Sequence, residues 1–301
     1  MTDPRATGPE LGASAPGDAR DEEVAAGYEL LDAGVRRKLE RFGPLTLDRP
    51  APGADGFRLN PAAWTGAHLR FDPGAGWSGP AWPAEPWPVE IGGLTMEVRP
   101  TDSGGVGLYP EHATNVPWLE AAVAARFGSG TAGGAPRVLN LFAHSGLATL
   151  ALARAGASVA HVDGARSAVA WARRNATLSG LEDRPIRWLV DDAAGFVARE
   201  ARRGQRYDGV VLDPPAFGRA GGREWRLEDD LAGLLSACRA IAEPSAFVLL
   251  TAHSEHVDGR RLGDELRTAF GRPGEIAVLP LELPATSGAK LSFGWAARLG
   301  S

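Results

Sequence analysis

The 301-residue sequence contains a single cysteine, Cys238, which excludes an internal disulfide and a cysteine-rich metal site. It has no apolar run of the roughly 18–20 residues that a membrane-spanning helix requires. Its net charge of −5 argues against a nonspecific nucleic-acid coat, which needs a strongly basic surface. Residues 1–23 are acidic, rich in Pro, Gly and Ala, and lack the apolar stretch of a secretory signal. We therefore expect a cytoplasmic protein with a disordered tail, no membrane contact and no metal.

Residues 24–104 are predicted to form a small β-rich domain, because short extended runs alternate there with Gly and Pro, as in DPGAGWSGPAWPAEPWP. Its tryptophans either close a small core or provide a stacking surface for nucleobases; they are Trp64, Trp77, Trp82 and Trp87. Residues 111–128 show the apolar spacing of a helix, and the glycine-rich residues 128–136 predict a flexible joint.

From Arg137 onward, apolar strand-like runs alternate with helical runs, beginning with RVLNLFA and continuing to AFVLLTAHS. This alternation predicts a parallel sheet covered by helices on both faces. The two closing runs, EIAVLPLELP and KLSFGWAARL, have no helix between them and predict a hairpin. We therefore expect an α/β domain over residues 105–301.

Small or acidic residues follow four of the predicted strands: Ser145-Gly146, Asp163, Asp192 and Asp213. Ligands of open α/β sheets bind beyond the carboxyl ends of the strands. The first turn has one glycine instead of G-x-G-x-x-G, which disfavours a pyrophosphate. Carboxylates suit a ligand that carries a sulfonium. Asp163 is the candidate to bind ribose hydroxyls, and Asp192 is the candidate to accept a hydrogen bond from an adenine amino group. The predicted ligand is therefore S-adenosylmethionine. The alternative for each aspartate is a helix N-cap.

The motifs NLFAHSG, HVD, WARRNA, DDA and LDPPAFG together resemble those of class I S-adenosylmethionine-dependent methyltransferases. More narrowly, they are similar to the ribosomal-RNA methyltransferases that include the large-subunit cytosine-5 and guanine-N enzymes. The resemblance covers residues 137–301 and extends upstream to GVGLYPEH, and residues 28–50 are similar to the opening segment of a bacterial subgroup. It implies a Rossmann-like, seven-stranded sheet with the last strand antiparallel. It also implies a cofactor site made of Tyr109, Glu111, Asn140, Phe142, Ala143, His144, Ser145, Gly146, Asp163, Asp192, Ala193 and Asp213.

The upstream segment departs from the related pattern K-T-G-x-x-x-D-Q at two places. Gly105-Val106 stand where the family has Lys-Thr, and Glu111-His112 stand where it has Asp-Gln. Glu111 can still accept a hydrogen bond from the amino group of the cofactor. His112 either takes the place of the glutamine or is a residue at a helix start.

The segment DPPAFG, residues 213–218, is the strongest chemical motif. In an amine-methylating enzyme, the Asp213 carboxylate and the Pro214 carbonyl accept hydrogen bonds from an exocyclic amine, which localises the nitrogen lone pair for in-line attack. Pro215 stiffens the corner, and Phe217 stacks on an extruded base. These four residues are the predicted catalytic set. The alternative is a proline-capped strand end.

A cysteine mechanism is disfavoured. Cytosine-5 methylation needs a thiolate that adds to the base, and Ala252-His253 stand where the related cytosine enzymes carry the cysteine. Cys238 lies in a predicted helix on an apolar face, so core packing is its expected role. His253 is either a proton acceptor or a hydrogen-bonded residue at a strand end.

The glycine-rich loop of residues 218–230 carries candidate substrate contacts, Arg219, Arg223 and Trp225. Guanidinium groups suit phosphates and an indole suits a base, although an ordinary loop is the alternative. The sequence thus predicts a methyltransferase that acts on a base of RNA, ribosomal RNA in particular. The alternatives are a methyltransferase for a small molecule or a protein, and a noncatalytic RNA-binding relative. The oligomeric state is not predicted.

Overall fold

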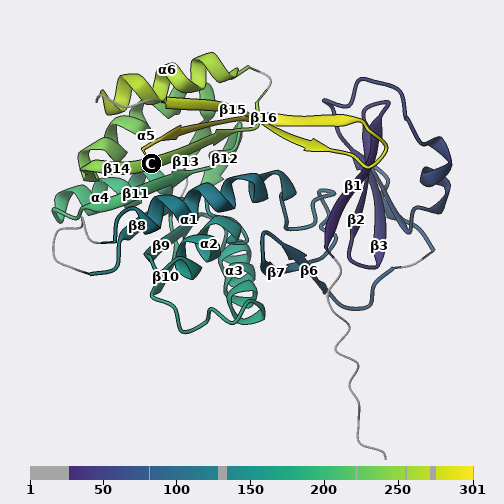
Figure 1. Ribbon diagram of the computed structural model, residues 1–301, viewed down its shortest axis with the longest axis horizontal. Coiled ribbons are helices and arrows are strands. Elements are labelled where there is room, and N and C mark those ends of the chain that lie inside the picture. The colour runs from purple at the N-terminus through teal and green to yellow at the C-terminus, as the bar shows by residue number, and fades with distance from the viewer. Residues whose placement is uncertain are drawn as a thin grey trace, which may run out of the picture.

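A seven-stranded sheet forms the centre of the computed structural model, which describes residues 27–80, 82–127, 134–220, 223–254, 256–271 and 276–300 (Figure 1). The predicted tail, residues 1–23, and most of the predicted joint, residues 128–133, lie outside the described residues. The strands of the sheet are β8 (Arg137–Leu141), β9 (Ser158–Asp163), β10 (Ile186–Val190), β11 (Tyr207–Leu212), β14 (Ala242–Ala252), β15 (Ile276–Pro284) and β16 (Lys290–Leu299).

The strand order is β10-β9-β8-β11-β14-β16-β15. Strands β8 to β11 and β14 pair in parallel. Strand β16 is antiparallel to both of its neighbours, β14 and β15. The predicted seven-stranded sheet, its antiparallel last strand and the closing hairpin are therefore confirmed.

Helices cover both faces of this sheet, as the alternating pattern predicts (Figure 1). They are α1 (Val116–Ala124), α2 (Leu147–Arg154), α3 (Arg166–Leu178), α4 (Ala193–Arg202), α5 (Leu227–Ile241) and α6 (Gly259–Phe270). The helix predicted over residues 111–128 is shorter, because its first turns form the 3-10 helix η2 (Pro110–Asn115).

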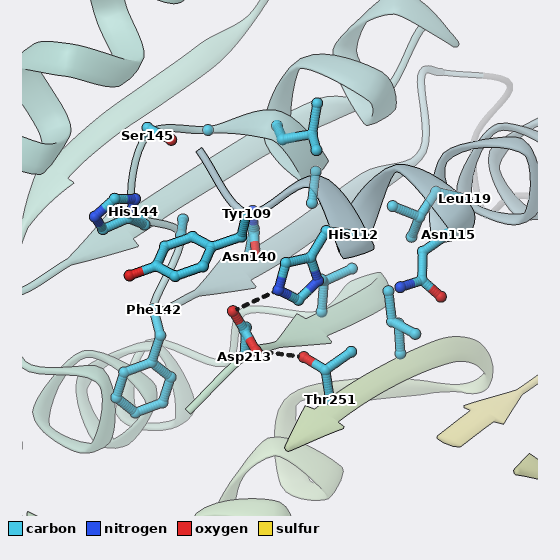
Figure 2. Close-up of a pocket in the computed structure, with 16 residues that line it drawn as sticks. Tyr109, His112, Asn115, Leu119, Asn140, Phe142, His144, Ser145, Asp213 and Thr251 are labelled. Atoms are coloured by element: carbon cyan, nitrogen blue, oxygen red, sulfur yellow. Dashed lines mark hydrogen bonds and ion pairs between the residues drawn. The ribbon is translucent and has the colours of Figure 1, made fainter. Parts of the chain in front are cut away.

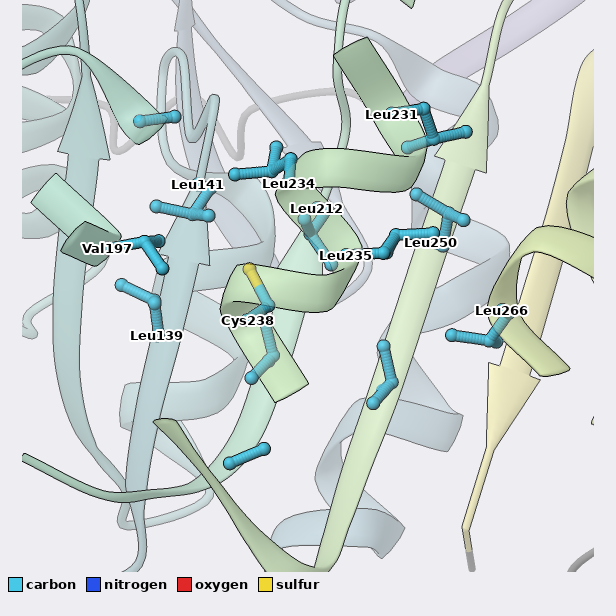
Figure 3. Close-up of a cluster of buried hydrophobic side chains, with 14 of the residues drawn as sticks. Leu139, Leu141, Val197, Leu212, Leu231, Leu234, Leu235, Cys238, Leu250 and Leu266 are labelled. Carbon is cyan, nitrogen blue, oxygen red and sulfur yellow. The ribbon is translucent and has the colours of Figure 1, made fainter. Parts of the chain in front are cut away.

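Successive residues of a central strand pack on opposite faces of the sheet. Leu139 and Leu141 of β8 join the buried cluster formed with α4, α5 and α6, whereas Val138 joins the cluster formed with α1 and α2. Cys238 of α5 lies fully buried in the first cluster, which confirms its predicted packing role (Figure 3). Such two-sided burial explains why the central strands read as continuous apolar runs.

The N-terminal region forms a second sheet and a separate hairpin. Strands β1 (Tyr28–Gly34), β2 (Arg37–Phe42), β3 (Leu45–Pro50), β4 (Leu69–Asp72) and β5 (Gly76–Ser78) make the sheet, and β6 (Trp87–Ile91) pairs with β7 (Leu94–Val98). Trp64 is buried, Trp77 and Trp87 are half-buried with their indole N–H groups bonded to backbone carbonyls, and Trp82 is exposed. Three of the four tryptophans therefore serve packing.

The β15–β16 hairpin reaches from the central sheet to the N-terminal sheet (Figure 1). At its tip, the backbone N–H groups of Thr286 and Ser287 donate to the carbonyls of Leu30 and Leu31, at 2.9 and 3.0 Å. The Ser287 hydroxyl donates to Asp32 at 2.7 Å. The hairpin thereby ties the two sheets together.

None of the helices in the described part of the chain has the length and apolar character of a membrane span.

Candidate active site

A cleft of about 520 Å³ lies at the carboxyl ends of β8, β9, β10 and β11. The loops after these strands supply most of its lining, as the four strand-end motifs predict. A small adjoining cavity of about 50 Å³ extends toward α1 and β14 (Figure 2). Cleft residues that also occur in the predicted site are Tyr109, Phe142, His144, Asp163, Asp192, Ala193, Asp213, Pro214, Pro215 and Trp225.

The charge of this cleft is negative. Its lining includes Asp163, Asp191, Asp192 and Asp213, and no Lys or Arg belongs to the described lining. Asp191 is paired with Arg199 and Asp213 with two histidines, whereas Asp163 and Asp192 have no cationic partner among the described residues. Such unpaired carboxylates repel a phosphate and attract a positively charged ligand. The cleft is therefore suited to a cationic, phosphate-free ligand.

The turn after β8 has a strained backbone. Phe142 and His144 have left-handed φ angles of 54° and 44°, and Gly146 has a φ of 94°. Non-glycine residues adopt this region at a cost, and such strain concentrates at ligand sites. Asp163 holds the turn, because its two carboxylate oxygens accept the backbone N–H groups of His144 and Ala165, each at 2.8 Å.

Further hydrogen bonds hold the turn after β8 in place. The Ser145 hydroxyl donates to the Gly107 carbonyl, and Asn175 of α3 donates its side-chain N–H to the Ser145 carbonyl at 2.8 Å. Asn140, a predicted cofactor residue, donates its amide N–H to Thr149 of α2 at 2.8 Å. Ala143, Ser145 and Gly146 line the smaller cavity. Contacts within the protein thus hold this turn in place.

His144 presents an unsatisfied polar atom beside the cleft. Its Nδ1 is buried and has no hydrogen-bond partner among the described residues. Burial lowers the pKa of His144, so the ring is neutral at pH 7. The Tyr109 ring lies edge-on to it, with 5.2 Å between ring centroids. An unpaired buried nitrogen is costly, and a ligand atom would remove that cost.

Asp191 and Asp192 follow β10. Asp192 caps α4, because its carboxylate accepts the Gly195 N–H at 2.7 Å. Asp191 is paired with Arg199. The N-cap alternative is thus confirmed for Asp192. Its other carboxylate oxygen has no hydrogen-bond partner among the described residues, and its adenine role stays a prediction.

Asp213, at the end of β11, lies in a polar cluster (Figure 2). Its Oδ1 accepts the Thr251 hydroxyl at 2.5 Å and lies 3.2 Å from His253 Nε2, while its Oδ2 lies 3.1 Å from His112 Nε2. Burial opposes ionisation of Asp213, but the two histidines outweigh it and hold its pKa well below the usual range. Burial disfavours the His253 imidazolium, yet Asp213 outweighs it and raises the pKa of His253 to about 9.

These two histidines come from distant parts of the chain. His112 lies on η2, and His253 follows β14, where its Nδ1 donates to the Phe293 carbonyl at 2.8 Å. A hydrogen-bonded strand-end histidine, one of the two readings of His253, is confirmed. The convergence of both rings on Asp213 was not predicted, because nothing in the local pattern links residues 112, 213 and 253.

Glu111 is buried next to this cluster and does not belong to the lining of either cavity. Its carboxylate lies 3.7 Å from His253 Nδ1. Its predicted contact with the amino group of a cofactor stays a prediction.

The segment after Asp213 forms a corner covered by a hairpin. The expected loop is wrong in part, because two strands form in it, β12 (Phe217–Ala220) and β13 (Arg223–Arg226). Trp225 donates its indole N–H to the Pro215 carbonyl at 2.7 Å, and its ring lies 5.2 Å from that of Phe142. Phe217 is 51% exposed at the edge of the corner.

The side chains of Arg219 and Arg223 lie outside what the structure describes. The backbone of Arg219 pairs with Glu224 in this hairpin. Their predicted contact with substrate phosphates therefore stays a prediction.

Comparison with known proteins finds a family model and curated relatives that match about half of the chain. A family model described as conserved hypothetical protein 95 matches residues 118–251. Ribosomal RNA large subunit methyltransferase I of Shewanella denitrificans is 31% identical over 158 residues, which are 52% of this chain and 35% of that protein. Ribosomal RNA large subunit methyltransferase K/L of Stutzerimonas stutzeri is 35% identical over 130 residues, 43% of this chain and 16% of that protein. The chain thus spans about a third or less of these curated relatives.

One solved structure matches along nearly the whole chain. The SAM-dependent methyltransferase of Agrobacterium tumefaciens superposes with a TM-score of 0.84 at 36% identity, and the match covers 91% of this chain and 90% of that one. The strand order, the acidic cleft and this similarity agree with one another. The chain therefore belongs to the family of S-adenosylmethionine-dependent methyltransferases.

Proposed function

We propose that this protein transfers the methyl group of S-adenosylmethionine to a base of ribosomal RNA. The observation that carries the proposal is the acidic cleft, free of Lys and Arg in its described lining, that runs from Asp163 and Asp192 to the Pro214-Pro215 corner. The cofactor supplies an electrophilic methyl group on a sulfonium. Such a cation fits a site that repels phosphates.

The strand-end residues fit the parts of this cofactor. Each Asp163 oxygen accepts one backbone N–H and keeps a further lone pair for a ribose hydroxyl. The second oxygen of Asp192 is suited to the adenine amino group. The strained turn of residues 142–146, with the unpaired Nδ1 of His144, is suited to the methionine portion.

The group of the substrate that accepts the methyl lies at Asp213. Thr251 and His253 approach one of its oxygens and His112 the other, so the carboxylate retains room for one further donor. We infer that Asp213 and the Pro214 carbonyl orient the acceptor group of the substrate. Trp225, held on the Pro215 carbonyl, and the exposed Phe217 provide aromatic surface for an extruded base. Cys238 takes no part, because it is buried in the core.

A second cleft, of about 480 Å³, reaches His253 from the side of the N-terminal sheet. His253 lines both clefts, and the second is also lined by Lys38, Phe293 and Trp295. Lys38 Nζ lies 4.9 Å from the centre of the Phe293 ring. The Lys38 ammonium is paired with the buried Glu40 carboxylate at 3.1 Å, so the aromatic side chains are what this cleft offers to a nucleobase. We propose this cleft as the substrate entrance.

The assignment to ribosomal RNA draws on the relatives, which bear that function in their names. A small molecule or a protein is the second candidate substrate, and the net charge of −5 favours it. Incubation with S-adenosylmethionine carrying a labelled methyl group, and ribosomal RNA from a strain that lacks the protein, separates the two. Label is expected in the RNA at one mapped nucleotide. RNA that stays unlabelled while a cell extract of small molecules or proteins gains label shifts the assignment to the second candidate.

Asp213→Ala tests the acceptor end. Calorimetry with S-adenosylhomocysteine is expected to show retained binding, whereas RNA methylation falls at least 100-fold. Binding of NAD instead of S-adenosylhomocysteine by the unaltered protein would contradict the cofactor assignment. Unchanged turnover in Asp213→Ala would contradict the role of Asp213.

A further inference from the structure

The cluster at Asp213 has the spacing of metal ligands. His112 Nε2 and His253 Nε2 lie 3.1 Å apart, and they lie 3.1 and 3.2 Å from the two Asp213 oxygens. Zinc bonds to nitrogen and oxygen ligands of about 2.0–2.2 Å place neighbouring ligand atoms about 2.8–3.1 Å apart in octahedral geometry and about 3.3–3.6 Å apart in tetrahedral geometry. We propose that His112, His253 and Asp213 bind a divalent transition-metal ion of the zinc class.

Hydrogen bonding alone leaves this cluster unsatisfied. If both Nε2 atoms carry protons for Asp213, two N–H groups face one another across 3.1 Å. If His253 donates to His112 instead, the bare His112 nitrogen faces the carboxylate oxygen across 3.1 Å. Each arrangement contains one repulsive contact. A cation among these three side chains makes all of the contacts favourable, because every ligand then offers a lone pair.

Hydrogen bonds from neighbouring groups orient His253 and Asp213 in the way that metal-binding side chains are oriented. His253 donates its Nδ1–H to the Phe293 carbonyl at 2.8 Å, so Nε2 is the ring nitrogen that faces the cluster, and a bound metal would displace its proton. The Thr251 hydroxyl donates to Asp213 Oδ1 at 2.5 Å. Metal-bound histidines and carboxylates are held by such second contacts in proteins.

Charge balance also favours a divalent ion. The buried Glu111 carboxylate lies 3.7 Å from His253, and its oxygen and a ring nitrogen of each histidine fall within 4.8 Å of one another. Together with Asp213, Glu111 supplies two negative charges for two positive ones. Two imidazoles with carboxylates favour zinc, manganese or iron(II) over calcium or magnesium, which prefer oxygen ligands alone.

The expectation of no metal rested on the lack of cysteine, and a histidine–carboxylate site does not need cysteine. Asp213 and His253 line the larger cleft, so an ion between them has a side open to that cleft. Such an ion would help to position the substrate beside the Pro-Pro corner. Metal occupancy is measured without turnover, so the result is independent of whether RNA is the substrate.

The test is metal binding by the full chain. After treatment with a chelator and dialysis, zinc is titrated by calorimetry and its retained content is measured by elemental analysis. One equivalent per chain is expected for the unaltered protein and for the control His256→Ala, whose ring is exposed. His112→Ala and His253→Ala are expected to bind at least about 100-fold more weakly.

Cobalt(II) gives a readout that does not depend on the variants. The unaltered chain is expected to develop visible d–d absorption with one equivalent of cobalt, and zinc is expected to abolish it by competition. S-adenosylhomocysteine binding by each variant shows that it has folded. No stoichiometric zinc or cobalt binding overturns the proposal, as does zinc affinity that folded His112→Ala and His253→Ala both keep.

Discussion

The hydroxyl of Ser145 donates a hydrogen bond to the backbone carbonyl of Gly107, and this bond joins the turn after β8 to a segment 38 residues earlier in the chain. Asn175 holds the Ser145 carbonyl from the other side at 2.8 Å. The turn that faces the cleft is therefore clamped between the GVGLYPEH segment and α3. The following predictions test this clamp and other parts of the fold.

Gly107→Ala is expected to disrupt the clamp. Gly107 has a φ of 78°, and an added Cβ would lie 2.0 Å from the Trp171 side chain. The strained backbone and the displaced indole together cost at least about 2 kcal/mol of unfolding free energy. Denaturant unfolding measures this loss, and S-adenosylhomocysteine affinity should fall with it. Gly56→Ala is the matched control, because a Cβ added at Gly56 has no neighbouring heavy atom within 4 Å. A variant as stable as the control would contradict the clamp.

Asp163→Asn is expected to weaken S-adenosylhomocysteine binding about tenfold or more. The carboxylate accepts two backbone N–H groups, and an amide can accept with only one of its two atoms. Loss of one such bond beside the strained turn costs on the order of 1–3 kcal/mol. Calorimetry on this variant and on Asp183→Asn, an exposed control, measures the difference. Equal affinity in the two variants would show that Asp163 does not organise the site.

Cys238 is expected to be chemically silent. Burial raises the pKa of this thiol to about 12, so the reactive thiolate is absent at pH 7–8. Ellman's reagent should detect no thiol in the native protein and one per chain after denaturation. Cys238→Ala should keep methyl transfer, since the thiol contributes only packing. Rapid labelling of the native protein, or lost turnover in a folded Cys238→Ala, would reopen the cysteine mechanism.

Asp32 is expected to make folding sensitive to acid. Burial alone would raise the pKa of this carboxyl, but hydrogen bonds from Trp64, Asn60, Ser287 and Leu59 outweigh it and lower the pKa. A lowered folded-state pKa stabilises the fold above the unfolded value of about 3.9, and this stabilisation is lost as pH falls through the folded-state pKa.

Asp32→Ala should therefore lower the unfolding free energy by about 3 kcal/mol at pH 7, with a difference that shrinks below about pH 4. Chemical denaturation across pH measures both effects. Asp55→Ala, whose side chain is 80% exposed, should change little. A difference from the unaltered protein that is constant from pH 7 to pH 3 would rule out ionisation of Asp32 as its cause.

Much of the catalytic half of the fold could be predicted from local patterns. Parallel strands end at one edge of a sheet, so Asp163, Asp192 and Asp213 were expected to lie near one another once the alternation from Arg137 was recognised. The cleft brings all three together. The missing glycines and the acidic strand ends also sufficed to select a phosphate-free ligand over a dinucleotide.

The sequence by itself determined the alternating strands and helices, the edge where the aspartates gather and the class of ligand, because these follow from periodicity and residue chemistry within short windows. Only the tertiary structure decided that His112 meets His253, 141 residues later, at Asp213. It also decided that Ser287 reaches back to Asp32, 255 residues earlier. Contacts of such separation arise from the packing of whole elements against one another, which no local pattern encodes.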